Sequence, residues 1–124
     1  MAFQSSPVLD FSFKAAEDLR NHQYCFVRVN KNAEIQLLKS DSELPDGVLQ
    51  NFPNTREEAT VRILGISKVR ANSALEVGTF VKSLINGYAE NYEESPQLIT
   101  GRVMGASQSK DDLCSVLLTP YVGL

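Results

Sequence analysis

Hydrophobic and polar residues alternate with a period of two along much of the chain after residue 24, as they do in half-buried β-strands. In the run 24–29, Cys25, Val27 and Val29 share one face, and Tyr24, Phe26 and Arg28 share the other. In the run 33–38, Ala33, Ile35 and Leu37 point inward and Glu34 and Gln36 point outward. Because the polar cluster 30–32 separates the two runs, they predict a β-hairpin.

The same pattern predicts further short strands separated by turn residues. We expect them at 9–13, 48–51, 59–69, 79–85, 88–90, 98–106 and 113–118. Residues 15–20 favour helix by propensity and predict one helical turn. About eight short strands with one or two helical turns are typical of an all-β protein, a small sandwich or barrel.

Two glycine-containing segments predict turns. Asn86-Gly87 is the residue pair of a type I′ hairpin turn, in which both central residues have positive φ. Pro45-Asp46-Gly47 predicts a second turn, because proline presets φ and glycine tolerates positive φ. These elements divide the chain into an N-terminal arm (1–8), a single β domain (9–118) and a C-terminal tail (119–124).

Composition narrows the classes of function. The 124 residues are 43% hydrophobic and carry a net charge of −3, which suits one globular domain. A nucleic-acid binder would need clustered Lys and Arg, so we expect no nucleic-acid partner. The first residues do not have the pattern of a signal peptide, and no apolar run approaches membrane-spanning length. We therefore expect no membrane partner and a protein made in the cytoplasm.

The residue types that carry chemistry form no catalytic constellation. Cys25 and Cys114 lie in apolar runs and are expected to be reduced, buried thiols. His22 is the single histidine and is expected in a surface turn. The carboxylates fall in predicted loops and are expected to form a solvated rim. We therefore expect no enzymatic activity, no metal and no cofactor.

A modest basic group is the one charged feature that suggests a partner. Lys68, Arg70 and Lys82 form a modest basic cluster near the predicted strands 61–69 and 79–82. They are too few, and too poor in interleaved aromatic residues, for nucleic acid. Contact with an acidic protein surface is the better interpretation.

Several segments, in order, resemble the capsid decoration (cement) proteins of tailed phages. The matching stretches cover about residues 13–118 and are Phe13-Lys14-Ala15-Ala16-Glu17-Asp18-Leu19, Gln23-Tyr24-x-Phe26-Val27, Pro45-Asp46-Gly47-Val48-Leu49-Gln50-Asn51-x-Pro53, Glu58-Ala59-Thr60-Val61-x-Ile63-x-Gly65-Ile66-Ser67-Lys68-Val69, Ala74-Leu75-x-x-Gly78-x-x-Val81, Asn86-Gly87-x-Ala89, Gly101-x-Val103-x-Gly105-Ala106 and the closing run 113–118.

This resemblance implies a compact β domain without catalytic activity. It implies binding to the major capsid protein on the outer surface of the virion, with homo-oligomers, trimers above all, and a host-cytoplasmic stage during assembly. The N-terminal segment 1–11 is a candidate docking element, with Phe3, Val8, Leu9 and Phe11 as apolar contacts to the capsid or to a neighbouring subunit. The alternative is that Leu9 and Phe11 only form the first strand and the rest of the segment is disordered. Alternatives are another virion β-domain (tail or fibre base), a small oligonucleotide-binding barrel and, last, an enzyme.

Overall fold

The computed structural model describes residues 8–94 and 98–118 and confirms the all-β prediction. This part of the chain contains ten strands, one more than the nine segments predicted, because the segment 59–69 forms two of them. They are β1 (Leu9–Ala15), β2 (Phe26–Val29), β3 (Glu34–Gln36), β4 (Gly47–Leu49), β5 (Glu58–Leu64), β6 (Ile66–Arg70), β7 (Phe80–Ser83), β8 (Ala89–Asn91), β9 (Gly101–Gly105) and β10 (Leu113–Leu118).

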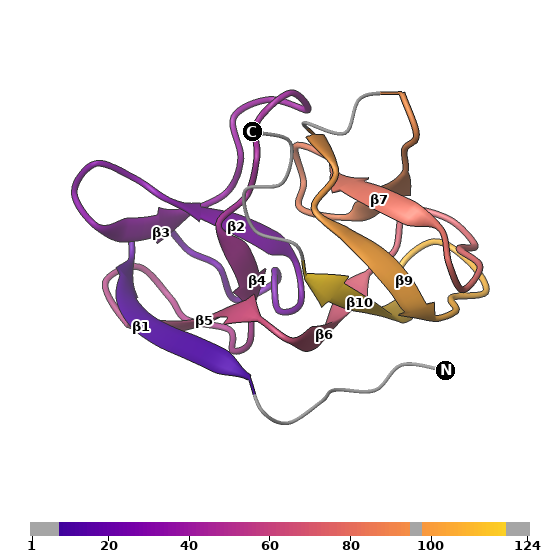
Figure 1. Ribbon diagram of the computed structural model, residues 1–124. Coiled ribbons are helices and arrows are strands. Elements are labelled where there is room, and N and C mark those ends of the chain that lie inside the picture. Colours follow the sequence, from indigo (N-terminus) through magenta and orange to yellow (C-terminus); the bar gives the residue numbers. More distant parts are fainter. Residues whose placement is uncertain (1–7, 95–97, 119–124) are drawn as a thin grey trace.

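The strands form a closed barrel and an open sheet that lie side by side (Figure 1). The barrel has the order β1-β3-β2-β4-β5 and closes because β1 pairs antiparallel with β5 and parallel with β3. The five-stranded sheet has the order β6-β10-β9-β7-β8. Its last strand in sequence, β10, lies between β6 and β9, so the sheet is complete only when the end of the domain is in place.

Two hydrophobic cores explain the consecutive apolar residues of β2 and β4. Val27, Leu49 and their neighbours fill the barrel, whereas Phe26 and Val48 belong to the core that the open sheet covers. Successive side chains of a strand point to opposite faces, so this barrel wall is buried on both sides. In β3 the predicted Ile35 is buried, but Ala33 is exposed and lies in the turn, with φ of +59°.

Gly65 divides the single strand predicted over 59–69 into two strands of different sheets. Its φ of +103° is costly for any residue with a side chain, and β5 of the barrel ends directly before it. β6 of the open sheet begins directly after it. The period-two pattern continues across Gly65, so the pattern itself does not reveal the change of sheet.

The hairpin at Asn86-Gly87 is confirmed, but the predicted type I′ turn is wrong. β7 pairs antiparallel with β8, and the amide of Gly87 donates to the carbonyl oxygen of Leu84 at 2.9 Å. Gly87 has φ of +84°, whereas Asn86 has a negative φ. The connection is therefore a three-residue loop that ends in a left-handed glycine.

The helical turn predicted at 15–20 is also wrong. β1 extends to Ala15, and the amides that follow bond to distant segments: Ala16 N to Ile35 O at 2.8 Å and Leu19 N to Pro53 O at 2.9 Å. Leu19 is fully buried in the barrel core. Long-range hydrogen bonds and burial thus outweigh the weak helical propensity of a six-residue stretch.

Pro45-Asp46-Gly47 does not form the predicted turn. Gly47 is the first residue of β4. The backbone amide of the preceding residue, Asp46, donates a hydrogen bond to the carbonyl oxygen of Val27 at 2.8 Å. A Cβ at position 47 would lie 2.4 Å from the carbonyl oxygen of Arg62. Close contact between β4 and β5, and not turn geometry, is the reason for glycine here.

Candidate functional site

The structure does not bring the three predicted basic contact residues together. Lys68 and Arg70 lie on β6, at one edge of the open sheet, and Lys82 lies on β7. β10 and β9 separate these two strands. The two strands follow one another in the sequence, but β6 and β7 are not neighbours in the sheet, so their basic residues do not form one cluster.

Each of these cations has a local partner. The ammonium of Lys68 lies 5.9 Å from the centroid of the Tyr24 ring, and Arg70 Nε donates to the carbonyl oxygen of Gln23 at 2.9 Å. Lys82 Nζ lies 5.0 Å from the ring centroid of Tyr92. The contacts hold loops against the sheet and do not form one basic surface.

The predicted apolar contact residues fall at the start of β1. Phe3 lies outside the described residues, and Val8 is half-buried just before the strand. Leu9 and Phe11 are exposed, at 38% and 47%. The register places Leu9 opposite Leu64, which is 43% exposed. Sequence reasoning missed Leu64; its position next to the strand-breaking Gly65 is the signal that could have marked it.

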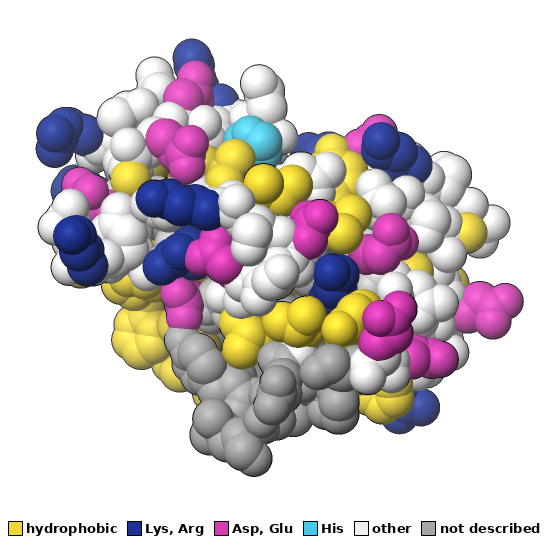
Figure 2. Space-filling model, turned by 90° about the horizontal axis from the view of Figure 1, so that it is seen from above, with side chains coloured by type: hydrophobic (Ala, Val, Ile, Leu, Met, Phe, Trp, Pro, Cys, Tyr) yellow, Lys and Arg dark blue, Asp and Glu magenta, His cyan; other side chains and the backbone are white. Residues whose placement is uncertain are grey.

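A polar depression of about 350 Å³ lies on the hairpin formed by β2 and β3. Its lining is three cations and three side-chain amides: Arg28, Lys31, Lys39, Asn30, Asn32 and Gln36. In the view of Figure 2, Lys and Arg side chains gather over the barrel half of the molecule. The sequence analysis did not identify this group, because its members are spread over a strand, a turn and a loop.

The turn of the hairpin holds the depression in shape. The side-chain oxygen of Asn30 accepts hydrogen bonds from the backbone amides of Asn32 and Glu34, at 2.9 and 3.0 Å. The amide of Ala33 donates to the carbonyl oxygen of Asn30 at 3.0 Å. Asparagine is well suited to this local bonding in turns. Its amide group also donates to Gln36 Oε1 at 3.1 Å, which ties the turn to β3.

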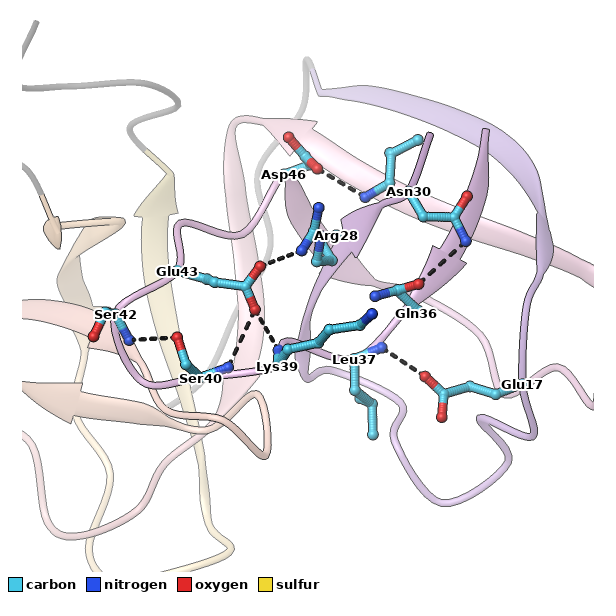
Figure 3. A network of polar contacts seen from close by, with 11 residues as sticks. Glu17, Arg28, Asn30, Gln36, Leu37, Lys39, Ser40, Ser42, Glu43 and Asp46 are labelled. Atoms are coloured by element: carbon cyan, nitrogen blue, oxygen red, sulfur yellow. Dashed lines mark hydrogen bonds and ion pairs between the residues drawn. The ribbon is translucent and has the colours of Figure 1, made fainter. Parts of the chain in front are cut away.

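Glu43 positions the loop that borders the depression (Figure 3). One carboxylate oxygen accepts from the backbone amides of Lys39 and Ser40, and the other forms an ion pair with Arg28. The side chains of this pair are about three-quarters buried, at 26% and 30% exposed. Nearby, Asp46 Oδ2 accepts from the amide of Val29 at 2.7 Å, and Glu17 Oε2 from the amide of Leu37 at 2.9 Å.

The other acidic residues have comparable local roles. Their positions are mostly exposed, in agreement with the prediction, but several accept hydrogen bonds that fasten turns. Asp18 forms a two-pronged ion pair with Arg20 that lowers the pKa of the carboxyl to about 2. The hydroxyl of Tyr88 donates to Asp111 at 2.6 Å, and this bond raises the pKa of the tyrosine.

The two cysteines are free and buried, as predicted. Burial raises the pKa of both thiols to about 12. Within residues 8–94 and 98–118, no group of three or more His, Cys, Asp or Glu side chains is arranged to hold a metal ion. In the same part of the chain, no helix is long and apolar enough to cross a membrane.

The fold of this chain is also found in a solved phage structure. The sequence matches no family model and no curated protein. The structure is similar to the crystal structure of the N base of the head fiber gp8.5 of bacteriophage phi29, with a TM-score of 0.73. The two chains share one fold. The match covers 94% of this chain and 98% of the fiber base at 17% sequence identity.

Proposed function

We propose that the protein is a structural component of a phage virion that binds the outer surface of the assembled capsid through the major capsid protein. The observation that carries the proposal is the fold match to the phi29 head-fiber base. Because the match covers nearly all of both chains, it concerns the arrangement of the whole domain and not one motif. The ordered resemblance of residues 13–118 to capsid decoration proteins supports the same role.

Two finer roles are compatible with this proposal. A decoration protein stabilises the shell directly, by repeating many small contacts with the symmetry of the capsid. A fibre base attaches a longer appendage to the head. The segments of sequence favour decoration, and the structural neighbour favours the fibre base. Our primary assignment is decoration, in a homo-oligomer for which we propose a trimer.

The exposed apolar residues of the barrel support a contact surface at β1. Leu9, Phe11 and Leu64 are each at least 38% exposed, and Leu9 and Leu64 are register partners. Leu9 and Leu64 adjoin across the β1–β5 pair, and adjoining apolar side chains left exposed in this way are suited to contact with another protein. Val8, the last residue of the predicted arm, directly precedes β1, which makes this surface suitable for capsid or subunit contacts.

We propose that the role is non-enzymatic and requires no cofactor. The thiols are buried and have a pKa of about 12, so they are poor nucleophiles. The carboxylates of Glu43, Asp46 and Glu17 accept hydrogen bonds from backbone amides, and Glu43 also forms an ion pair with Arg28. These contacts give the side chains a structural purpose.

Co-sedimentation with heads of the phage that encodes the chain tests the proposal. The purified protein is mixed with unexpanded heads, expanded heads and isolated tails, and each sample is run through a gradient. We expect saturable binding to heads and none to tails. Binding to tails alone, or to none of the three, contradicts the proposal.

The thermal stability of the heads separates the two finer roles. A decoration protein raises the temperature at which DNA-filled heads release their DNA. A fibre base binds heads without changing that temperature. The matched control is bovine serum albumin at the same concentration, which is expected neither to sediment with heads nor to stabilise them.

A further inference from the structure

We propose that the depression on the β2–β3 hairpin binds an acidic segment of polypeptide, with carboxylate side chains placed between Arg28, Lys31 and Lys39. The inference deepens the proposed function, on which it rests only for the identity of the partner, the capsid surface. The recognition chemistry itself follows from the described residues of the hairpin.

The side-chain acceptors of three residues at the depression, Asn30, Gln36 and Glu43, are already used by the framework. Asn30 Oδ1 accepts hydrogen bonds from two backbone amides, and Gln36 Oε1 accepts a hydrogen bond from the side-chain amide of Asn30. Both oxygens of Glu43 are bonded. The polar groups that remain to meet a ligand are therefore mainly donors, and a donor-lined concavity selects a ligand rich in acceptor oxygens.

The hydrogen-bond donors that remain belong to the charged side chains of Arg28, Lys31 and Lys39. Arg28 is held in place by its pair with Glu43, and its planar guanidinium carries further N–H groups suited to a carboxylate. Lys31 and Lys39 project from the turn and from the loop after β3. In the described part of the chain, no carboxylate contacts either ammonium group. Arg28, Gln36 and Lys39 come together near the centre of Figure 3.

The size of the site fits side chains and not a large rigid ligand. A volume of about 350 Å³ is at the lower end of the range of ligand pockets. The lining contains no aromatic ring on which a nucleobase could stack. The net charge of −3 also disfavours binding of a long polyanion, because such a ligand interacts with the whole protein surface. A short acidic loop contacts only the local cations.

The site is held ready before binding, which lowers the entropic cost of association. The β2–β3 register pairs Arg28 with Gln36. The turn is closed by Asn30, and the following loop is anchored by Glu43. Of the three lining cations, Arg28 is therefore already held in place, and Lys31 and Lys39 are the two that a ligand has to order.

The direct test is a titration of the full-length protein with an acetylated hexapeptide of alternating Glu and Gly, followed by NMR chemical shifts. We expect shifts confined to residues 28–39 and affinity that falls as salt is added. The double variant Lys31→Gln, Lys39→Gln should bind at least tenfold more weakly. The matched control is Lys14→Gln, Lys110→Gln, which removes the same charge from exposed lysines elsewhere and should bind as the wild type does.

Two further probes complete the test. The same peptide with Gln in place of Glu should not bind, and a 12-nucleotide oligo-dT should bind no better than it does to the Lys31→Gln, Lys39→Gln variant. Shifts outside the hairpin, equal binding by the two double variants, or preferential oligo-dT binding at residues 28–39 would overturn the inference. Thermal unfolding of each variant confirms that the domain is folded.

Head binding distinguishes this inference from the proposed function. If the wild type co-sediments with heads and the Lys31→Gln, Lys39→Gln variant does so at least tenfold more weakly, both stand. If both proteins bind heads equally, the depression is not the docking site and the proposed function stands. If the peptide binds as expected but heads do not, the recognition chemistry stands and the proposed function fails.

Discussion

Gly87 joins the two halves of the molecule, because its carbonyl oxygen accepts a hydrogen bond from the amide of Phe26 at 2.8 Å. Gly87 belongs to the β7–β8 hairpin of the open sheet, and Phe26 is the first residue of β2 in the barrel. A turn that seems purely local in the sequence is therefore part of the contact between barrel and sheet.

Replacing Gly87 with alanine should destabilise the domain by roughly 2–5 kcal/mol. The added Cβ meets a positive φ of +84° and lies 2.7 Å from both Cys25 Cβ and Phe26 O. Denaturant unfolding measures the change. Asn86→Ala, next to it, removes one exposed side-chain hydrogen bond to the amide of Tyr88 and should cost about 1 kcal/mol. Equal stability of the two variants would contradict this account of Gly87.

Asp10→Ala should destabilise the protein by about 3 kcal/mol. Asp10 forms an ion pair with Arg62 at 2.9 Å, and the side chain of Arg62 is only 10% exposed. Without the carboxylate of Asp10, the charged guanidinium keeps one backbone acceptor, the carbonyl oxygen of Ile66. The control is Lys14→Ala on the same strand, which breaks an exposed pair with Glu58 and should change the free energy of unfolding by less than about 1 kcal/mol. A thermal or denaturant melt in which both variants lose the same stability would refute the buried role of Arg62.

Both thiols should react with a chromogenic disulfide reagent on the order of a thousandfold more slowly in the folded protein than in denaturant at pH 8. Burial raises the pKa of Cys25 and Cys114 to about 12, so only a minute fraction is thiolate at that pH, and the reagent has little access. In denaturant both thiols should react at the rate of a simple thiol. Rapid labelling of one thiol in native buffer would show that its strand opens readily.

Deleting residues 1–8 should leave the thermal midpoint of the isolated domain nearly unchanged and weaken head binding at least tenfold, about 1.4 kcal/mol per site. The physical reason is that β1 and the described residues of both cores lie after this segment, whose Phe3 and Val8 are apolar residues suited to contact with a partner. Co-sedimentation with heads measures the effect, with the full-length protein as reference. Undiminished binding would mean that the docking surface lies elsewhere on the domain.

The sequence by itself determined the features that depend on local geometry. Period-two alternation identifies strands because side chains of a strand alternate between faces, and Asn86-Gly87 identifies a hairpin because glycine accepts positive φ. The same local reasoning correctly predicted that Cys25 and Cys114 are buried and free. The all-β class follows from the number and spacing of such segments.

Only the tertiary structure decided which strands are neighbours. The alternation of 59–69 is the same on both sides of Gly65, yet β5 belongs to the barrel and β6 to the open sheet. Lys82 is far from Lys68 because β10, from the end of the domain, lies beside β6. The depression likewise depends on Glu43 drawing the loop after β3 toward Arg28. Strand pairing and loop closure join residues distant in sequence, so they are determined by the packing of the whole chain, which a local pattern does not contain.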